Sequence, residues 1–171
     1  MNIPSTATGE QLANALRALG VKFIMGGSRG DQSLHKQPAR LIAALAESNE
    51  SRLRLSLIPL FLEHPEFAAH VRRAANHVNP AARLTLQCYY TAAVWLQRKH
   101  RPRLGLLIGR KASLQDYFSS ELGLQNTDDP NINLQRLAQR HRILSGAQVN
   151  WLGTYEHAVQ VWVKGLEIQK A

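Results

Sequence analysis

The chain has 171 residues, 44% of which are apolar, and a formal net charge of +9. That length suits one domain with a real core, because a chain of about 150 residues buries roughly 70% of its unfolded surface. The single cysteine, Cys88, excludes an intrachain disulfide, and no apolar run is long enough to span a membrane. Since the N-terminus lacks the pattern of a signal peptide, we expect a cytoplasmic protein with no membrane contact.

Residues 8–20 form the first predicted helix. Leucines recur along it at helical spacing, and Gly20 suits a C-terminal cap. The largely apolar residues 21–25 have the composition of a short strand, the only strand that we predict. All other patterns favour an all-α fold, a single compact multi-helix domain over residues 1–171, in which the segment 1–36 carries the weakest pattern.

Two helical segments are predicted next along the chain. Residues 38–47 resume the helical spacing of apolar side chains. Residues 51–63 are apolar on more than one face, which is typical of a helix at the centre of a core. Because proline cannot donate to the helical hydrogen-bond ladder, we expect Pro59 to kink or interrupt this second helix.

Prolines mark the starts of two more helices. Pro65 and Pro80 each fit the first position of a helix, and Asn79 is a favourable N-cap for the second one. That second helix is expected to run to about Lys99. We therefore predict that the most basic part of the chain follows the end of a long helix.

The last third of the chain contains three further predicted helices. Ser113 and Asp116 resemble a capping box, which favours a helix to about Leu122. Asp129 precedes a second helix, over residues 130–142. The third has an apolar stripe that we expect to face the core, formed by Trp151, Tyr155, Val159, Trp162 and Leu166.

The net charge is concentrated in one window, residues 67–115, which contains no Asp or Glu. Outside this basic window, the twelve remaining Lys and Arg match the twelve Asp and Glu of the chain. Such one-sided charge indicates a polyanionic partner. The nine cations of the window are Arg72, Arg73, Arg83, Arg98, Lys99, Arg101, Arg103, Arg110 and Lys111.

Four of these cations fall within six residues at the end of the long helix: Arg98, Lys99, Arg101 and Arg103. Cations at a helix C-terminus are stabilised by the macrodipole, but four exceed what capping requires. We predict that this cluster contributes most to binding RNA, DNA or a nucleoprotein assembly, in a non-catalytic or accessory role. An accessory subunit that binds an acidic protein partner is a second alternative, after the catalytic one given below.

Aromatic residues are interleaved with these arginines, namely Tyr89, Tyr90 and Trp95. Aromatic side chains can stack on exposed bases, whereas arginines contact phosphates. The same residues also fit the apolar face of the long helix. Both interpretations, base stacking and core packing, follow from the sequence.

A glycine-rich stretch, Gly26-Gly27-Ser28, resembles the motif that follows the first strand of nucleotidyltransferase domains. That resemblance would imply a magnesium site held by a close pair of carboxylates. The chain offers only Asp31 here, so we predict no phosphoryl transfer. Binding of an anion by this turn and Arg29 stays open.

A second resemblance concerns Arg136 and His141, whose short spacing is similar to the motif of HEPN ribonucleases. It implies metal-independent RNA cleavage with these two residues, and this is the catalytic alternative to simple binding. The same spacing also occurs between Arg72 and His77 and between Arg29 and His35. The motif by itself therefore does not select one pair.

Three histidines lie in one segment, at positions 64, 70 and 77. Zinc sites use histidines at helical spacing, but this chain has no His-Glu-x-x-His pattern and no pair of thiols. We therefore predict no metal and no cofactor.

Overall fold

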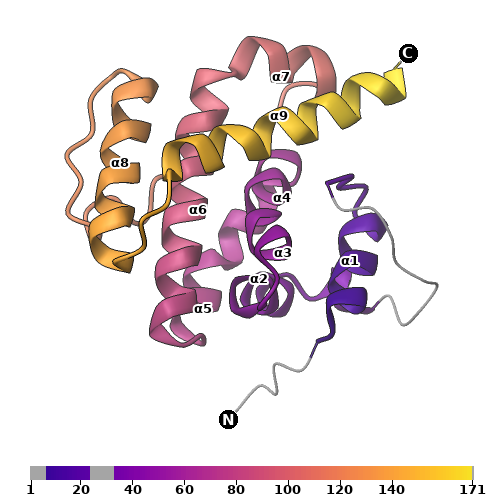
Figure 1. Cartoon of the computed structure of the whole chain (residues 1–171). Helices are drawn as coiled ribbons and strands as arrows, with labels where there is room; N and C mark the ends of the chain where they lie inside the picture. The colour runs from indigo at the N-terminus through magenta and orange to yellow at the C-terminus, as the bar shows by residue number, and fades with distance from the viewer. Residues whose placement is uncertain (1–6, 24–32, 171) are drawn as a thin grey trace.

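A computed structural model describes residues 7–23 and 33–170 of the chain (Figure 1). These residues form helices joined by turns and loops, and no strand occurs among them, so the all-α prediction is confirmed. The elements in chain order are α1 (Gly9–Ala18), η1 (Ser33–Lys36), α2 (Pro38–Glu47), α3 (Ser51–Leu55), α4 (Leu57–Glu63), η2 (Pro65–His70), α5 (Val71–Asn76), α6 (Pro80–Lys99), α7 (Arg101–Ile108), α8 (Pro130–Ser145) and α9 (Trp151–Lys170).

Helix α6 is the central element, and it packs most extensively against α8 and α4. It begins as predicted, because Asn79 Oδ1 accepts a hydrogen bond from Ala82 N at 2.8 Å and Pro80 occupies the first turn. Its side chains from Leu86 to Gln97 are all buried. A helix of this length spans about 30 Å, so it separates the region of α5 from that of α7 (Figure 1).

The predicted interruption of the helix over residues 51–63 occurs at Ser56, where α3 ends and α4 begins. A proline ring clashes with the carbonyl group four residues earlier, which for Pro59 belongs to Leu55. The helical ladder therefore stops at Leu55, and Pro59 lies in the first turn of α4, where no N–H donor is required. The sequence identified the cause of the break but not its position.

Helix α9 lies across α4, α6 and α8 (Figure 1). Its predicted core stripe is confirmed, since Tyr155, Val159, Trp162 and Leu166 are buried and Trp151 is half-buried. The indole of Trp162 donates from Nε1 to Glu63 Oε2 at 2.9 Å. Burial raises the pKa of Glu63, while this hydrogen bond and nearby positive charges oppose the rise.

The helix predicted from Ser113 to Leu122 is wrong. Residues 110–124 instead form an extended strap, with a single turn near its end, that runs back along α6. Gln97 Nε2 donates to Ala112 O at 2.9 Å, and its Oε1 accepts from Leu114 N at 2.8 Å. Because the Gln97 side chain binds Ala112 O and Leu114 N, these backbone groups are not available for the hydrogen bonds of a helix.

Two shorter predictions also change. Residues 21–23 form a turn after Gly20, not the predicted strand, and residues 24–25 lie outside the described part of the chain. A lone strand would leave its backbone groups without partners, which explains why a turn is preferred. The helix predicted at Pro65 starts there, but as a 3-10 turn that continues into α5.

Candidate functional site

The basic window divides into two clusters at opposite ends of α6 (Figure 1). Arg83 and Arg98 are about 22 Å apart along the helix axis at a rise of 1.5 Å per residue. The α5 cluster consists of Arg72, Arg73 and Arg83. The α7 cluster consists of Arg98, Lys99, Arg101, Arg103, Arg110 and Lys111.

The α5 cluster is largely engaged in holding the strap. The guanidinium carbon of Arg72 lies 4.4 Å from the centre of the Tyr117 ring. Arg83 pairs with Glu121 at 3.8 Å, and Gln87 donates to the same carboxylate at 2.9 Å. Two of the three cations in this cluster therefore have a structural role, and only Arg73 makes no such contact among the described residues.

Two cations of the α7 cluster are neutralised by helix α9. Lys99 pairs with Glu156, and Arg103 pairs with Glu167 at 2.6 Å. Both acidic residues lie far outside the basic window in sequence. The charge of Lys99 and Arg103 is therefore less available to a partner than the sequence implied.

The other four cations of the α7 cluster make no ion pair with any carboxylate in the described ranges. Arg98 stacks on the ring of Trp95 at 4.6 Å, and Arg101 donates to Ser113 Oγ at 2.6 Å. All four side chains are exposed: Arg98, Arg101, Arg110 and Lys111. This end of α6 therefore presents most of the uncompensated positive charge of the window.

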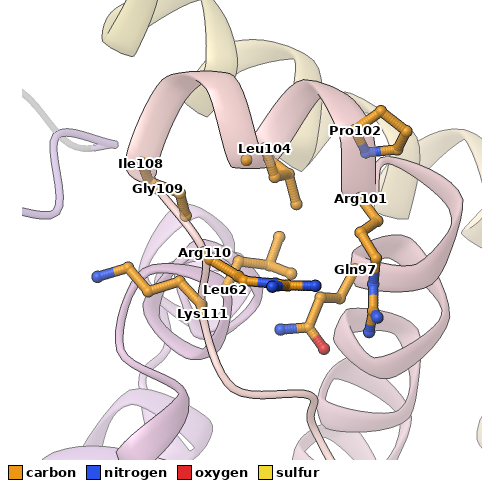
Figure 2. Close-up of a pocket in the computed structure, with 10 residues that line it drawn as sticks. Leu62, Gln97, Arg101, Pro102, Leu104, Ile108, Gly109, Arg110 and Lys111 are labelled. Carbon is orange, nitrogen blue, oxygen red and sulfur yellow. The ribbon is translucent and has the colours of Figure 1, made fainter.

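A cavity of about 350 Å³ lies under α7, between the end of α6, the end of α4 and the start of the strap. Figure 2 shows Arg110 extending across this space toward Gln97 and Arg101 lying along its edge beside Gln97, whereas Lys111 points away. Leu62, Leu104 and Ile108 add apolar walls. The arrangement combines two cationic groups with an apolar lining.

Gln97 connects this cavity to the fold. Its side chain is buried, with 6% exposure, and both ends of its amide bind the strap at Ala112 and Leu114. It therefore fixes the segment that carries Arg110. Sequence analysis did not single out Gln97, although an amide within the apolar run of α6 is a signal that a buried backbone partner exists.

A second cavity, of about 1140 Å³, lies where α3, α6, α8 and α9 meet. His141 lines this cavity together with Tyr89 and Trp151, while Arg136 does not contribute to its wall. Tyr89, Tyr90 and Trp95 are all buried, so the aromatic residues considered for base stacking belong to the core.

His141 is itself part of that core, with 2% exposure. Its Nδ1 lies 2.6 Å from the hydroxyl of Tyr155, and its ring stacks on Trp151 with the ring centres 3.6 Å apart. The indole N–H of Trp151 has no hydrogen-bond partner among the described residues. Burial lowers the pKa of His141 to about 4, so the imidazole is neutral at pH 7.

Arg136 points elsewhere. It is exposed and donates to Gln125 O at 2.7 Å. Five positions along an α-helix correspond to a rotation of about 140°, so Arg136 and His141 occupy different faces of α8. The structure does not bring the two residues of the ribonuclease motif together.

The remaining candidates give no assembled site. Among the described residues, no group of three or more His, Cys, Asp or Glu side chains is placed to hold a metal ion. His64 instead contacts Glu66 at 3.1 Å and Leu19 O at 2.6 Å. The Gly26-Gly27-Ser28 stretch, with Arg29 and Asp31, lies outside the described residues.

Over residues 7–23 and 33–170, none of the helices combines the length and the apolar character that crossing a bilayer requires.

Comparison of the chain with family models, with curated proteins and with solved structures gives no significant match. Its function is therefore inferred from the charges, cavities and contacts of its own side chains.

Proposed function

We propose that the protein binds RNA or DNA, alone or in a nucleoprotein assembly, without acting on it chemically. The interface that we infer is the exposed part of the α7 cluster. One observation carries the proposal: Arg98, Arg101 and Arg110 gather at one end of the molecule without a carboxylate partner in the part of the chain that the structure describes, and Lys111, whose charge acts on Glu63 without forming an ion pair, lies beside them. A polyanion would supply the missing negative charge.

The chemistry of the interface favours phosphates over bases. Arginine presents a planar fork of donors that matches phosphate oxygens, and several such contacts add an affinity that depends strongly on salt. The aromatic side chains closest to the cluster in sequence are buried, so they offer no stacking surface. We therefore expect binding with little dependence on base sequence.

The test is the affinity for a generic oligonucleotide as a function of salt. If four to six phosphates are contacted, the logarithm of the affinity should fall against the logarithm of salt with a slope of roughly −3 to −5. Binding that is absent at low salt, or that does not depend on salt, would contradict the proposal. An acidic protein would then be the better candidate for the partner.

Two double variants locate the interface. Arg98→Gln with Arg101→Gln removes two unpaired charges, and we expect a loss of affinity on the order of tenfold. Lys99→Gln with Arg103→Gln removes two charges that α9 already neutralises, so the loss should be clearly smaller. Thermal unfolding of each variant verifies that the fold is retained. Equal losses in the two variants would mean that only net charge matters, and the interface would not be at Arg98 and Arg101.

A further inference from the structure

We infer that the cavity under α7 binds the terminal phosphate monoester of a nucleic-acid strand, with Arg101 and Arg110 as the two phosphate ligands. This inference rests on the proposed function and names the group that the interface recognises. The other two cations of the interface, Arg98 and Lys111, would still contact internal phosphates along the strand.

The first argument is the charge of the cavity. Arg101 and Arg110 both line one cavity of about 350 Å³, their guanidinium groups lie on the same side of it beside Gln97 (Figure 2), and neither makes an ion pair among the described residues. Two like charges that share a cavity repel each other, and a dianion between them would replace repulsion with charge-assisted hydrogen bonds. Arg101 uses one donor on Ser113 Oγ and keeps its others available.

The second argument is the shape of the cavity, which favours a strand end. Its inner walls are Leu62, Gln97 and Leu104, exposed by only 1%, 6% and 5%, so a strand cannot continue through them. An internal phosphodiester needs an exit on both sides, whereas a terminal group needs one opening. A terminal monoester also carries about −1.5 to −2 charges and three acceptor oxygens, which suits two arginines better than a diester with a single charge.

The third argument is the apolar lining. A free phosphate ion would need polar groups on every side, but Leu62, Leu104 and Ile108 form much of this wall. The volume is in the range of sites that hold small organic ligands, of about 300–1,000 Å³. The cavity thus has room for the phosphate together with part of the terminal sugar or base.

The fourth argument is that contacts within the fold fix the strap next to Arg110 and the side chain of Arg101 before any ligand binds. Gln97 fixes the strap at Ala112 and Leu114, and Arg101 binds the strap at Ser113. Gly109 has a φ of +76°, a conformation that favours glycine, and this turn directs the chain from α7 into the strap at Arg110. Groups fixed before binding lose less entropy when the ligand arrives.

The experiment compares three forms of one single-stranded oligonucleotide: with a 5′ phosphate, with a 3′ phosphate, and with hydroxyl groups at both ends. We expect at least one phosphorylated form to bind about tenfold more tightly than the hydroxyl form, the change produced by one charge-assisted hydrogen bond. The two phosphorylated forms identify which end is recognised. A nucleoside monophosphate that bound as tightly as the phosphorylated strand would overturn the assignment to a strand end.

The variant Arg101→Gln with Arg110→Gln should abolish the preference for the phosphorylated end. Arg40→Gln with Arg73→Gln removes the same charge from exposed arginines on α2 and α5, and should keep the preference. Arg101→Lys with Arg110→Lys retains the charge but not the planar fork, so the preference should be reduced while binding of the hydroxyl form is maintained.

The outcomes separate this inference from the proposed function. Equal affinity of the native protein for all three strands would overturn the inference and leave nucleic-acid binding in place. A preference that survives in the Gln double variant would also overturn it. Failure of every strand to bind at low salt would overturn both proposals.

Discussion

Two cavities in the described part of the molecule differ in how their polar groups are used. The larger cavity, of about 1140 Å³, is lined by His141, Tyr89 and Trp151, whose rings pack on one another within the core. The smaller one, of about 350 Å³, is lined by Arg101 and Arg110, whose charges the described part of the fold leaves without a carboxylate. Volume alone would favour the first as a binding site. Unneutralised charge favours the second.

The largest effect is expected at His141, in the large cavity, and concerns the pH dependence of the free energy of unfolding. Burial lowers its pKa to about 4 from an ordinary value of 6.5, so the unfolded chain takes up this proton first as pH falls. Above pH 6.5 the histidine is neutral in both states and the folded protein keeps its full stability. Between pH 6.5 and about 4 only the unfolded chain is protonated, so the stability decreases as the pH falls. We expect the free energy of unfolding to fall by about 3 kcal/mol through this group, measured by chemical denaturation at a series of pH values.

The variant His141→Phe retains stacking on Trp151 but cannot titrate, so this part of the pH dependence should disappear. His157 is an exposed histidine that lines the same cavity, and His157→Gln serves as the matched control for the loss of one imidazole. A native-like pH profile in His141→Phe would show that His141 is not a buried neutral core residue.

The next largest loss of stability is expected on substitution of Gln97, because its side chain binds the strap beside the small cavity. Gln97→Met removes two hydrogen bonds and leaves the buried N–H of Leu114 without a partner, which should cost about 1–3 kcal/mol of stability. The strap should also hold Arg110 less firmly, so the preference for a phosphorylated strand should decrease. Denaturant unfolding and binding titrations measure the two effects.

Gln87 is a matched control on the same helix. Its single hydrogen bond goes to Glu121, near the α5 end of the strap, far from the small cavity. Gln87→Met should therefore destabilise the protein less and leave the preference for phosphorylated strands unchanged. If Gln87→Met lost that preference and Gln97→Met kept it, the phosphate site would lie at the α5 end of α6 and not in the small cavity.

A small effect is expected at the rim of the large cavity. Leu144 lines it and is 41% exposed, so Leu144→Gln removes apolar surface with little change in packing. We expect stability within about 0.5 kcal/mol of the native protein and the same oligonucleotide affinity within about twofold. A clear loss of affinity would show that the large cavity contributes to the interface.

The last prediction is that the protein does not cleave RNA. Because Arg136 and His141 lie on different faces of α8 and His141 is buried, single-stranded RNA should stay intact during incubation with the protein. The comparison is RNA integrity with the native protein and with His141→Phe. Cleavage by the native protein that disappears in the variant would favour the ribonuclease alternative, whereas equal traces in both would indicate contamination.

Local chemistry explains what the sequence could predict. The starts of α6 and α8 depend on an N-cap followed by proline, at Asn79 and Asp129, and both lie where the pattern placed them. The core stripe of α9 follows from helical spacing alone. Such features need no information from distant parts of the chain.

Contacts between distant residues explain what the sequence could not predict. The strap is extended because Gln97 and Tyr90 bind its backbone from α6, the latter through a hydrogen bond of 2.6 Å to Gln115 O. Lys99 pairs with Glu156, which lies 57 residues further along the chain. The sequence therefore presented nine equivalent cations, and only folding distinguishes the paired from the unpaired ones.

The most direct measurement is the change in backbone amide chemical shifts when a 5′- or 3′-phosphorylated oligonucleotide is added to the isotopically labelled protein. We expect the largest changes over residues 101–113, in α7 and the start of the strap, and smaller ones near Arg73. The amides beside His141 and Trp151 should hardly move. Changes centred on the large cavity, with α7 unaffected, would contradict the claim that unpaired charge at the α7 cluster forms the binding site.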